Sequence, residues 1–147
     1  MENRKFHRVC AEIIIMQLVF YKGNCQKGKI NILSFGFNKT GDIKGNEPGI
    51  HAEHDVINKL KPLYRKKRLE SINLLVIRFS KNNKLQNSKP CANCIKIMKT
   101  LPQKKGYIIK NIYYSNNNGE IVKSNLNNLE KEELHYTRFY RRKISNT

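Results

Sequence analysis

Apolar residues recur along the chain with two spacings, one typical of helices and one typical of strands. Helical spacing predicts a first helix over residues 3–13. The apolar run 13–21 and the alternating stretch 30–37 each predict a strand, and Gly23 and Gly28 predict the turn between them. We therefore expect a helix followed by a β-hairpin.

The middle of the chain continues this alternation between helices and strands. Helical spacing after His51 predicts a second helix, which Pro62 is expected to end. The nearly continuous apolar run 72–79 is typical of a central strand that helices cover on both faces. A polar loop then leads to a third predicted helix, which starts at Cys91 and is expected to end at Pro102.

A tight turn joins the last two predicted strands. Residues 107–115 alternate between two faces, with Ile108 expected on the same face as Ile112. The sequence of residues 116–119 is typical of a hairpin turn and leads into a final strand over residues 120–124, which would be antiparallel to the one before it. Helices and strands in this order predict an α/β fold.

The chain closes with a basic and aromatic segment from about Leu126 onward, which is expected to be helical at its start. Its arginines lie among aromatic residues: Tyr136, Arg138, Phe139, Tyr140, Arg141 and Arg142. Arginine and aromatic side chains together can hold phosphates and stack on bases. The same aromatic side chains can instead dock the end of the chain onto the domain. Both interpretations are open from the sequence.

The length and the charge of the chain narrow the class of protein. With 147 residues it is long enough for one domain, residues 1–147, with its own core. The formal net charge of +18 suggests a polyanionic partner such as nucleic acid. However, Lys, Asn and Ile make up 57 of the 147 residues, and all three have A/T-rich codons. Codon bias does not obviously explain why only 11 acidic residues accompany 29 basic ones, so contact with nucleic acid is an open alternative.

The sequence also bears on the cellular compartment. No apolar stretch reaches the roughly eighteen residues of a membrane-spanning helix, and no signal peptide is recognisable. Four cysteines, two of them in one C-x-x-C pair, suit a reducing compartment and a metal better than a set of disulfides. We expect a soluble intracellular protein that does not contact a membrane.

Two short motifs carry the candidate chemistry. They are H-x-E at residues 51–53 and P-C-x-x-C at residues 90–94. Zinc prefers thiolate and imidazole ligands, and a catalytic zinc keeps one of its four positions open for water. Cys91 and Cys94, three residues apart at the start of a helix, can both reach one ion. The N-terminus of that helix also favours their thiolate form.

His51 would complete this site as the third ligand, and Glu53 would lie beside the water without touching the metal. A lone C-x-x-C pair can instead be a redox pair or half of a structural zinc site. A structural site needs a fourth protein ligand, and Cys10 and Cys25 do not form a second C-x-x-C pair. The joint pattern therefore favours a catalytic zinc.

The two motifs, in this order, resemble the signature of the cytidine and deoxycytidylate deaminase superfamily, which removes an amino group from a base by hydrolysis. The resemblance implies one catalytic Zn²⁺ ion held by His51, Cys91 and Cys94. It implies that Glu53 takes a proton from water and passes it to a ring nitrogen of the base. It also implies a three-layer α/β/α sandwich around a mixed five-stranded sheet.

Two further residues are expected to contact the substrate. Asn38 follows the second strand, where members of this superfamily commonly place an Asn that contacts the sugar, although Asn38 can also simply start a turn. Ala52, inside the H-x-E motif, is the second expected contact. Members of the superfamily often assemble with active sites near subunit interfaces, so we also expect a homo-oligomer.

Three functions compete for this site. An antiparallel final pair of strands favours a cytosine-type nucleoside or nucleotide as substrate, because the similar tRNA adenosine deaminases place a helix between these strands. The charge and the C-terminal arginines favour a base within RNA or DNA, cytosine or tRNA adenosine, which must be flipped or single-stranded. The third is a non-enzymatic nucleic-acid-binding protein with a structural zinc, which has no use for Glu53. We expect a zinc-dependent hydrolase.

Overall fold

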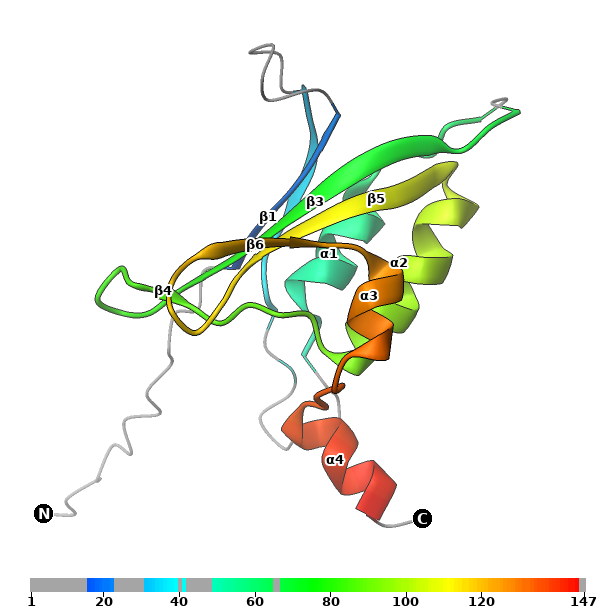
Figure 1. Cartoon of the computed structure of the whole chain (residues 1–147). Helices are drawn as coiled ribbons and strands as arrows, with labels where there is room; N and C mark the ends of the chain where they lie inside the picture. The colour runs from blue at the N-terminus through cyan, green and yellow to red at the C-terminus, as the bar shows by residue number, and fades with distance from the viewer. Residues whose placement is uncertain (1–15, 23–30, 40, 42–48, 65–66, 146–147) are drawn as a thin grey trace, which may run out of the picture.

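The computed structural model describes residues 16–22, 31–39, 41, 49–64 and 67–145. In this part of the chain a mixed sheet is covered on one face by helices (Figure 1). The first predicted helix, over residues 3–13, lies outside the described residues. No described helix has the length and the apolar character that crossing a membrane requires.

The strands of the sheet run in both directions. They are β1 (Met16–Lys22), β2 (Asn31–Gly36), β3 (Glu70–Phe79), β4 (Leu85–Gln86), β5 (Tyr107–Ser115) and β6 (Ile121–Ser124). Their order is β2-β1-β3-β5-β6, and the short β4 also pairs with β3. The β3–β5 pair is parallel, whereas β1–β2, β1–β3 and β5–β6 are antiparallel. The sheet is therefore mixed, with β3 at its centre.

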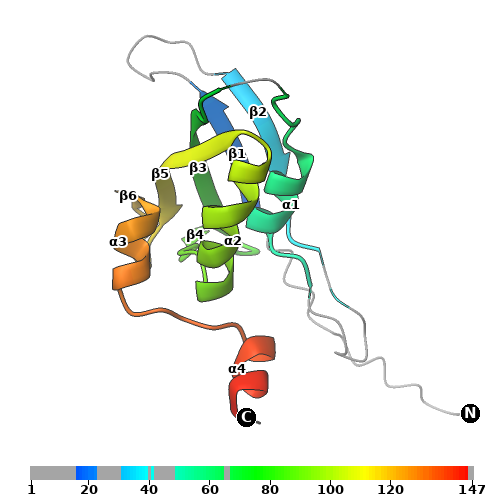
Figure 2. The same ribbon diagram turned by 90° about the vertical axis from the view of Figure 1, so that its right-hand side faces the viewer.

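Three helices pack against the same face of this sheet. The described helices are α1 (Ala52–Lys59), α2 (Ala92–Lys104), α3 (Leu126–Lys131) and α4 (Arg138–Ser145). α1 contacts β1 and β2, while α2 and α3 contact each other and β5. Figure 2 shows α1, α2 and α3 on one face of the sheet and α4 apart from it, beyond the N-terminal end of α2.

The core lies between this sheet face and the helices. Ile72, Leu74 and Val76 alternate along β3, and none of them has any exposed surface. Val56 of α1 and Ile95 of α2 belong to the same buried cluster. Helices as short as α1 are marginal by themselves, so burial of these apolar side chains holds them on the sheet.

Most of the predicted elements are present where they fall on described residues. A strand precedes each of the two motifs, and each motif lies at the start of a helix, as predicted. The strand pairs of both predicted hairpins are antiparallel. The second helix ends at Lys59, before Pro62. Of the predicted first strand, 13–21, the structure describes the part from Met16 onward. The α/β class is therefore confirmed, with a mixed sheet.

One face of β5 differs from the prediction. The pairing of β5 with β3 skips Lys110, which is an extra residue in the ladder. Such an irregularity shifts the alternation of side chains by one position. As a result Ile109, rather than Ile108, shares the buried face with Ile112, and Ile108 is 41% exposed.

One helix end departs from the prediction, and two of the described elements were not predicted. α2 does not end at Pro102 but continues to Lys104, where the Lys105 N–H bonds to the Pro102 carbonyl in a tightened last turn. A proline so close to the helix end removes one N–H without breaking the turns before it. The predicted loop before α2 contains the short strand β4, and the C-terminal segment contains a second helix, α4.

Gly36 allows β2 to approach α1 very closely. A Cβ atom at this position would lie 2.5 Å from the Val56 nitrogen and 2.8 Å from the Ala52 carbonyl oxygen. On the same face of β2, the Ser34 hydroxyl donates to the Val56 carbonyl at 3.0 Å. The end of β2 therefore fixes the backbone position of the first turns of α1.

We expect Gly36→Ala to destabilise the protein by about 1–3 kcal/mol, the usual range for overpacking a close contact, because the obstructing atoms are backbone. Chemical denaturation measures the free energy of unfolding. Asn31→Ala, at an exposed position of the same strand, is the matched control and should change it by less than about 0.5 kcal/mol. Equal effects of the two substitutions would contradict the close packing of β2 on α1.

Candidate metal centre

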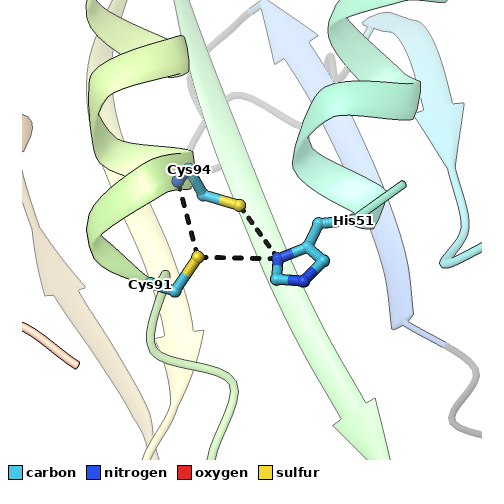
Figure 3. Close-up of side chains that lie close together, drawn as sticks. All are labelled: His51, Cys91 and Cys94. Atoms are coloured by element: carbon cyan, nitrogen blue, oxygen red, sulfur yellow. Dashed lines mark hydrogen bonds between the residues drawn. The ribbon is translucent and has the colours of Figure 1, made fainter. Parts of the chain in front are cut away.

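His51 occupies the N-cap position of α1, but its side chain does not cap the helix. Asn38, just beyond β2, takes over this role, since its Oδ1 accepts a hydrogen bond from the Ala52 N–H at 2.8 Å. The first turn of a helix leaves several N–H groups without helical partners, and an amide oxygen satisfies one of them. The imidazole of His51 is thereby left to point towards α2 (Figure 3).

Asp55 fastens the first turn of α1 to the end of β2. Its carboxylate accepts hydrogen bonds from the Phe37 N–H at 3.1 Å and from Lys59 at 2.6 Å, and it pairs with Lys39 at 2.6 Å. Burial would raise the pKa of Asp55, but these three donors together lower it to about 2. The start of α1 is therefore held by the charge-assisted hydrogen bonds of Asp55 and by the close approach of Gly36.

Cys91 occupies the corresponding N-cap position of α2. Its sulfur accepts a hydrogen bond from the Cys94 N–H at 3.5 Å, so the thiolate itself caps the helix. The positive end of the helix dipole stabilises a negative sulfur at this position. Cys94, one turn along, is 1% exposed and lies on the same side of the helix.

The loop that leads into Cys91 is held by a buried serine pair. The Ser88 hydroxyl donates to the Val76 carbonyl of β3 at 2.7 Å and lies 2.8 Å from the Ser115 hydroxyl of β5. The Ser88 N–H also bonds to the Ser115 carbonyl at 2.8 Å. Both serines are buried, so these bonds satisfy their polar groups and join the loop to the ends of the two parallel strands.

Three side chains from α1 and α2 converge at one point (Figure 3). The Nδ1 atom of His51 lies 3.2 Å from the sulfur of Cys94 and 3.6 Å from that of Cys91. All three candidate ligand atoms lie within 4.8 Å of one another. Zinc bonds of about 2.3 Å to sulfur and about 2.0–2.1 Å to nitrogen place tetrahedral N and S ligands about 3.6 Å apart. Both the spacing and the soft donors therefore fit a metal ion such as zinc.

The protonation of these groups also fits a cation. The Cys94 thiol, the His51 ring and the Cys94 N–H together lower the pKa of Cys91 to about 4, although burial opposes the shift. The pKa of Cys94 is raised, because its proton is shared with the Cys91 sulfur and because burial disfavours a second thiolate. The hydrogen bond with Cys91 raises the pKa of His51 above 6.5. A metal ion at this group would therefore displace protons.

Glu53 lies beside the three candidate ligands and is 2% exposed. Burial raises the pKa of its carboxyl group, against the lowering effects of its own backbone N–H and of His51. Its Oε2 atom has no hydrogen-bond partner among the described residues. Buried carboxylates normally have partners, so this atom is suited to a group that binds in the adjacent cavity.

A cavity of about 220 Å³ opens beside the cluster. His51, Glu53, Cys91 and Asn38 line it, so two of the three predicted metal ligands, the predicted proton carrier and one predicted substrate contact border the same cavity. Ala52 is fully buried in the core, and its substrate contact stays a prediction. A larger cavity of about 620 Å³ lies elsewhere, between α2, α3 and β5, and contains none of these residues.

Six further residues line the cavity that we did not predict: Arg78, Asn87, Ser88, Lys89, His135 and Thr137. Arg78 has a signal in the sequence, because it continues the row of Leu74 and Val76 on β3 and so faces the helices. His135 and Thr137 have no such signal. Their place depends on the path of the C-terminal segment, which no local pattern records.

Cys94→Ser and His51→Ala should each weaken zinc binding by more than about 100-fold, because each removes one of three ligands. Competition with a chromogenic zinc chelator measures the affinity. His54→Ala, on the same helix but outside the cluster, is the control and should bind zinc as the wild type does. Affinity should also rise with pH up to and through the raised pKa of His51, because zinc displaces the imidazolium proton. Affinity independent of pH would contradict this ligand set.

Asp55→Asn should lower the free energy of unfolding by about 2 kcal/mol at pH 7. The pKa of Asp55 falls from 3.8 to about 2 on folding, so its contribution is present above pH 4 and is lost as the pH falls towards 2. Denaturation at pH 7 and at pH 2.5 should therefore show a large and then a small difference from the wild type. Glu133→Gln, an exposed carboxylate, is the control, and a difference independent of pH would contradict the role of Asp55.

Comparison of the sequence with protein-family models and with curated proteins found no match, and comparison of the structure with solved structures found none either. Function must therefore be inferred from the residues and their geometry. Among the described residues these establish a mixed α/β fold with a His/Cys/Cys group, His51, Cys91 and Cys94, that could hold a metal ion such as zinc.

Proposed function

We propose that this protein is a zinc-dependent hydrolytic deaminase of a cytosine-type nucleoside or nucleotide, with the three-layer fold of the superfamily that its motifs resemble. Glu53 is the observation that carries this proposal. Its carboxylate is buried in the same cavity as His51 and Cys91, yet it is not one of the three candidate ligands. A structural metal has no use for such a group, whereas hydrolysis needs a carboxylate that carries protons.

The proposed reaction divides the work between the metal and Glu53. Zinc, when bound, would act as a Lewis acid that lowers the pKa of water to about 7. Glu53 accepts a proton from the attacking water and delivers it to the ring nitrogen beside the amino-bearing carbon. It then moves the second water proton to the amino group. A carbon–oxygen bond forms, the carbon–nitrogen bond breaks, and the products are the keto base and ammonia.

The dimensions of the cavity suit a small substrate. Its volume of about 220 Å³ is below the roughly 300–1,000 Å³ of sites for drug-sized ligands, so it accommodates little more than one ring and its sugar. Asn38 lines the cavity while its Oδ1 caps α1, which is consistent with the proposed contact to the sugar. Ala52 is the other proposed substrate contact. It lies in the first turn of α1, where its N–H is bonded to Asn38.

The final hairpin supports the choice of a cytosine-type substrate. β5 and β6 are antiparallel and are joined by the turn at residues 116–119, the arrangement that the resemblance associates with deaminases of free cytidine. A second candidate is a base within single-stranded RNA or DNA, which is favoured by the basic helix α4 close to α2. A homo-oligomer stays a prediction from the resemblance.

The test is ammonia release by the zinc-loaded protein from cytidine, deoxycytidine, their monophosphates, adenosine, and single-stranded RNA and DNA. Glu53→Gln should lower turnover by about 10²–10⁴-fold, the usual contribution of a general acid–base group, while zinc content stays at one ion per chain. Glu120→Gln, an exposed glutamate of the final hairpin, should leave turnover unchanged. Full activity of Glu53→Gln, or loss of zinc from it, would overturn the assigned role.

A further inference from the structure

Cys91 and Cys94 form a pair whose chemistry is not limited to metal binding. Cys91 is the N-cap of α2, and Cys94 lies three residues on, in the first turn. Their sulfur atoms are no more than 4.8 Å apart, because all the atoms of the His/Cys/Cys group lie within that distance of one another. A C-x-x-C pair at the start of a helix is also the arrangement that disulfide oxidoreductases use. A disulfide between these two residues is therefore within reach.

The backbone that carries both cysteines is held by contacts outside the group. The Ala92 N–H donates to the His135 carbonyl at 2.9 Å, and the Asn93 side-chain amide donates to the Tyr140 hydroxyl at 3.2 Å. Figure 2 shows the C-terminal segment passing beneath this end of α2. Neither contact uses a candidate ligand atom, so the start of α2 is held whether or not a metal is bound.

The two sulfurs differ in their surroundings. Cys91 lines the cavity of about 220 Å³, whereas Cys94 is not among its lining residues and is 1% exposed. The Cys91 sulfur also accepts the Cys94 N–H at 3.5 Å, and the positive end of the helix dipole favours negative charge there. The thiolate is the nucleophilic form of cysteine. A small reagent that enters the cavity therefore meets Cys91 first, with Cys94 one turn behind it.

We propose that Cys91 and Cys94 are also a redox pair, which a small hydroperoxide entering the cavity converts reversibly into a disulfide. The Cys91 thiolate attacks one peroxide oxygen, the oxygen–oxygen bond breaks, and the released hydroxide takes a proton and becomes water. The Cys94 thiol then attacks the sulfenic sulfur of Cys91, so a sulfur–sulfur bond forms and a second water leaves with the thiol proton. Two thiols are oxidised, and one peroxide is reduced to two waters.

This disulfide would remove two of the three candidate ligands at once. Metals bind the thiolate form of cysteine, and a disulfide sulfur has no such charge to offer. His51 alone would remain, whereas a zinc site needs at least three protein ligands. Metal binding and oxidation therefore exclude one another, which gives the group a reversible inactive state. The inference concerns the metal group and does not depend on the reaction proposed for Glu53.

Mass spectrometry of the zinc-free protein after treatment with hydrogen peroxide tests this inference. Trypsin releases both cysteines in one peptide, residues 85–96, because it does not cleave between Lys89 and Pro90. This peptide should lose two hydrogens and should regain them when the oxidised protein is treated with dithiothreitol. In competition with a chromogenic chelator, the oxidised protein should bind zinc at least about 100-fold more weakly than the reduced protein.

Two single variants test the order of attack. In Cys94→Ser, peroxide should leave a sulfenic acid at Cys91 that dimedone traps. In Cys91→Ser, Cys94 should stay a free thiol, because it does not line the cavity. Trapping at Cys94 and not at Cys91 would overturn this order.

Two results would overturn the redox pair itself. One is a wild-type peptide that gains oxygen at either sulfur without losing two hydrogens. The other is an oxidised protein that binds zinc as tightly as the reduced protein does. Neither measurement depends on turnover, so the proposed function would stand in both cases.

Discussion

The N-termini of α1 and α2 lie side by side, and the candidate site depends on this one arrangement. His51 begins α1 and Cys91 begins α2, so the distance between the two helix starts sets the distance between imidazole and thiolate. Zinc bonds of about 2.0–2.3 Å require the nitrogen and sulfur ligands to lie close together, so this distance decides whether one ion can be held. Contacts at Gly36, Asp55 and Ser88 hold the two helix starts in place and therefore fix the distance between them.

The same arrangement stabilises charge in a buried place. Helix N-termini offer N–H groups and a positive dipole, which favour the thiolate at Cys91 and compensate for its partial removal from water. The carboxylate form of Glu53 is less well stabilised, since its Oε2 atom has no hydrogen-bond partner among the described residues and burial raises its pKa. A fold that only needed stability would replace such a carboxylate with an apolar side chain. Its presence beside three soft ligands therefore points to a function for the charge.

The C-terminal segment over residues 132–140 contributes to the candidate site. Residues 132–140 pass the start of α2, where the Ala92 N–H bonds to the His135 carbonyl and the Asn93 side chain bonds to Tyr140. His135 and Thr137 of this segment line the cavity, as does Arg78 of β3. Tyr140 of this segment contacts Asn93 of α2, as the docking interpretation expected, while Arg141 and Arg142 remain exposed.

The sequence by itself determined most of the described elements and the candidate metal ligands. The alternation of apolar residues located the strands and helices because burial on one face has a fixed period, and the two motifs contained the ligand types and their spacing within each helix. It also located Asn38 at the end of β2. Errors were local, as at Ile108 and Pro102, where a bulge or a helix end overrode the periodic pattern.

Only the tertiary structure decided how the parts meet. The distance from His51 to the cysteines, the capping of α1 by Asn38, and the arrival of His135 at the cavity are contacts between residues 14 to more than 80 positions apart. Such contacts depend on the packing of helices on the sheet and on the path of the chain between elements. Local periodicity contains no information about either, because it reports which face of an element is buried and not what is buried against it.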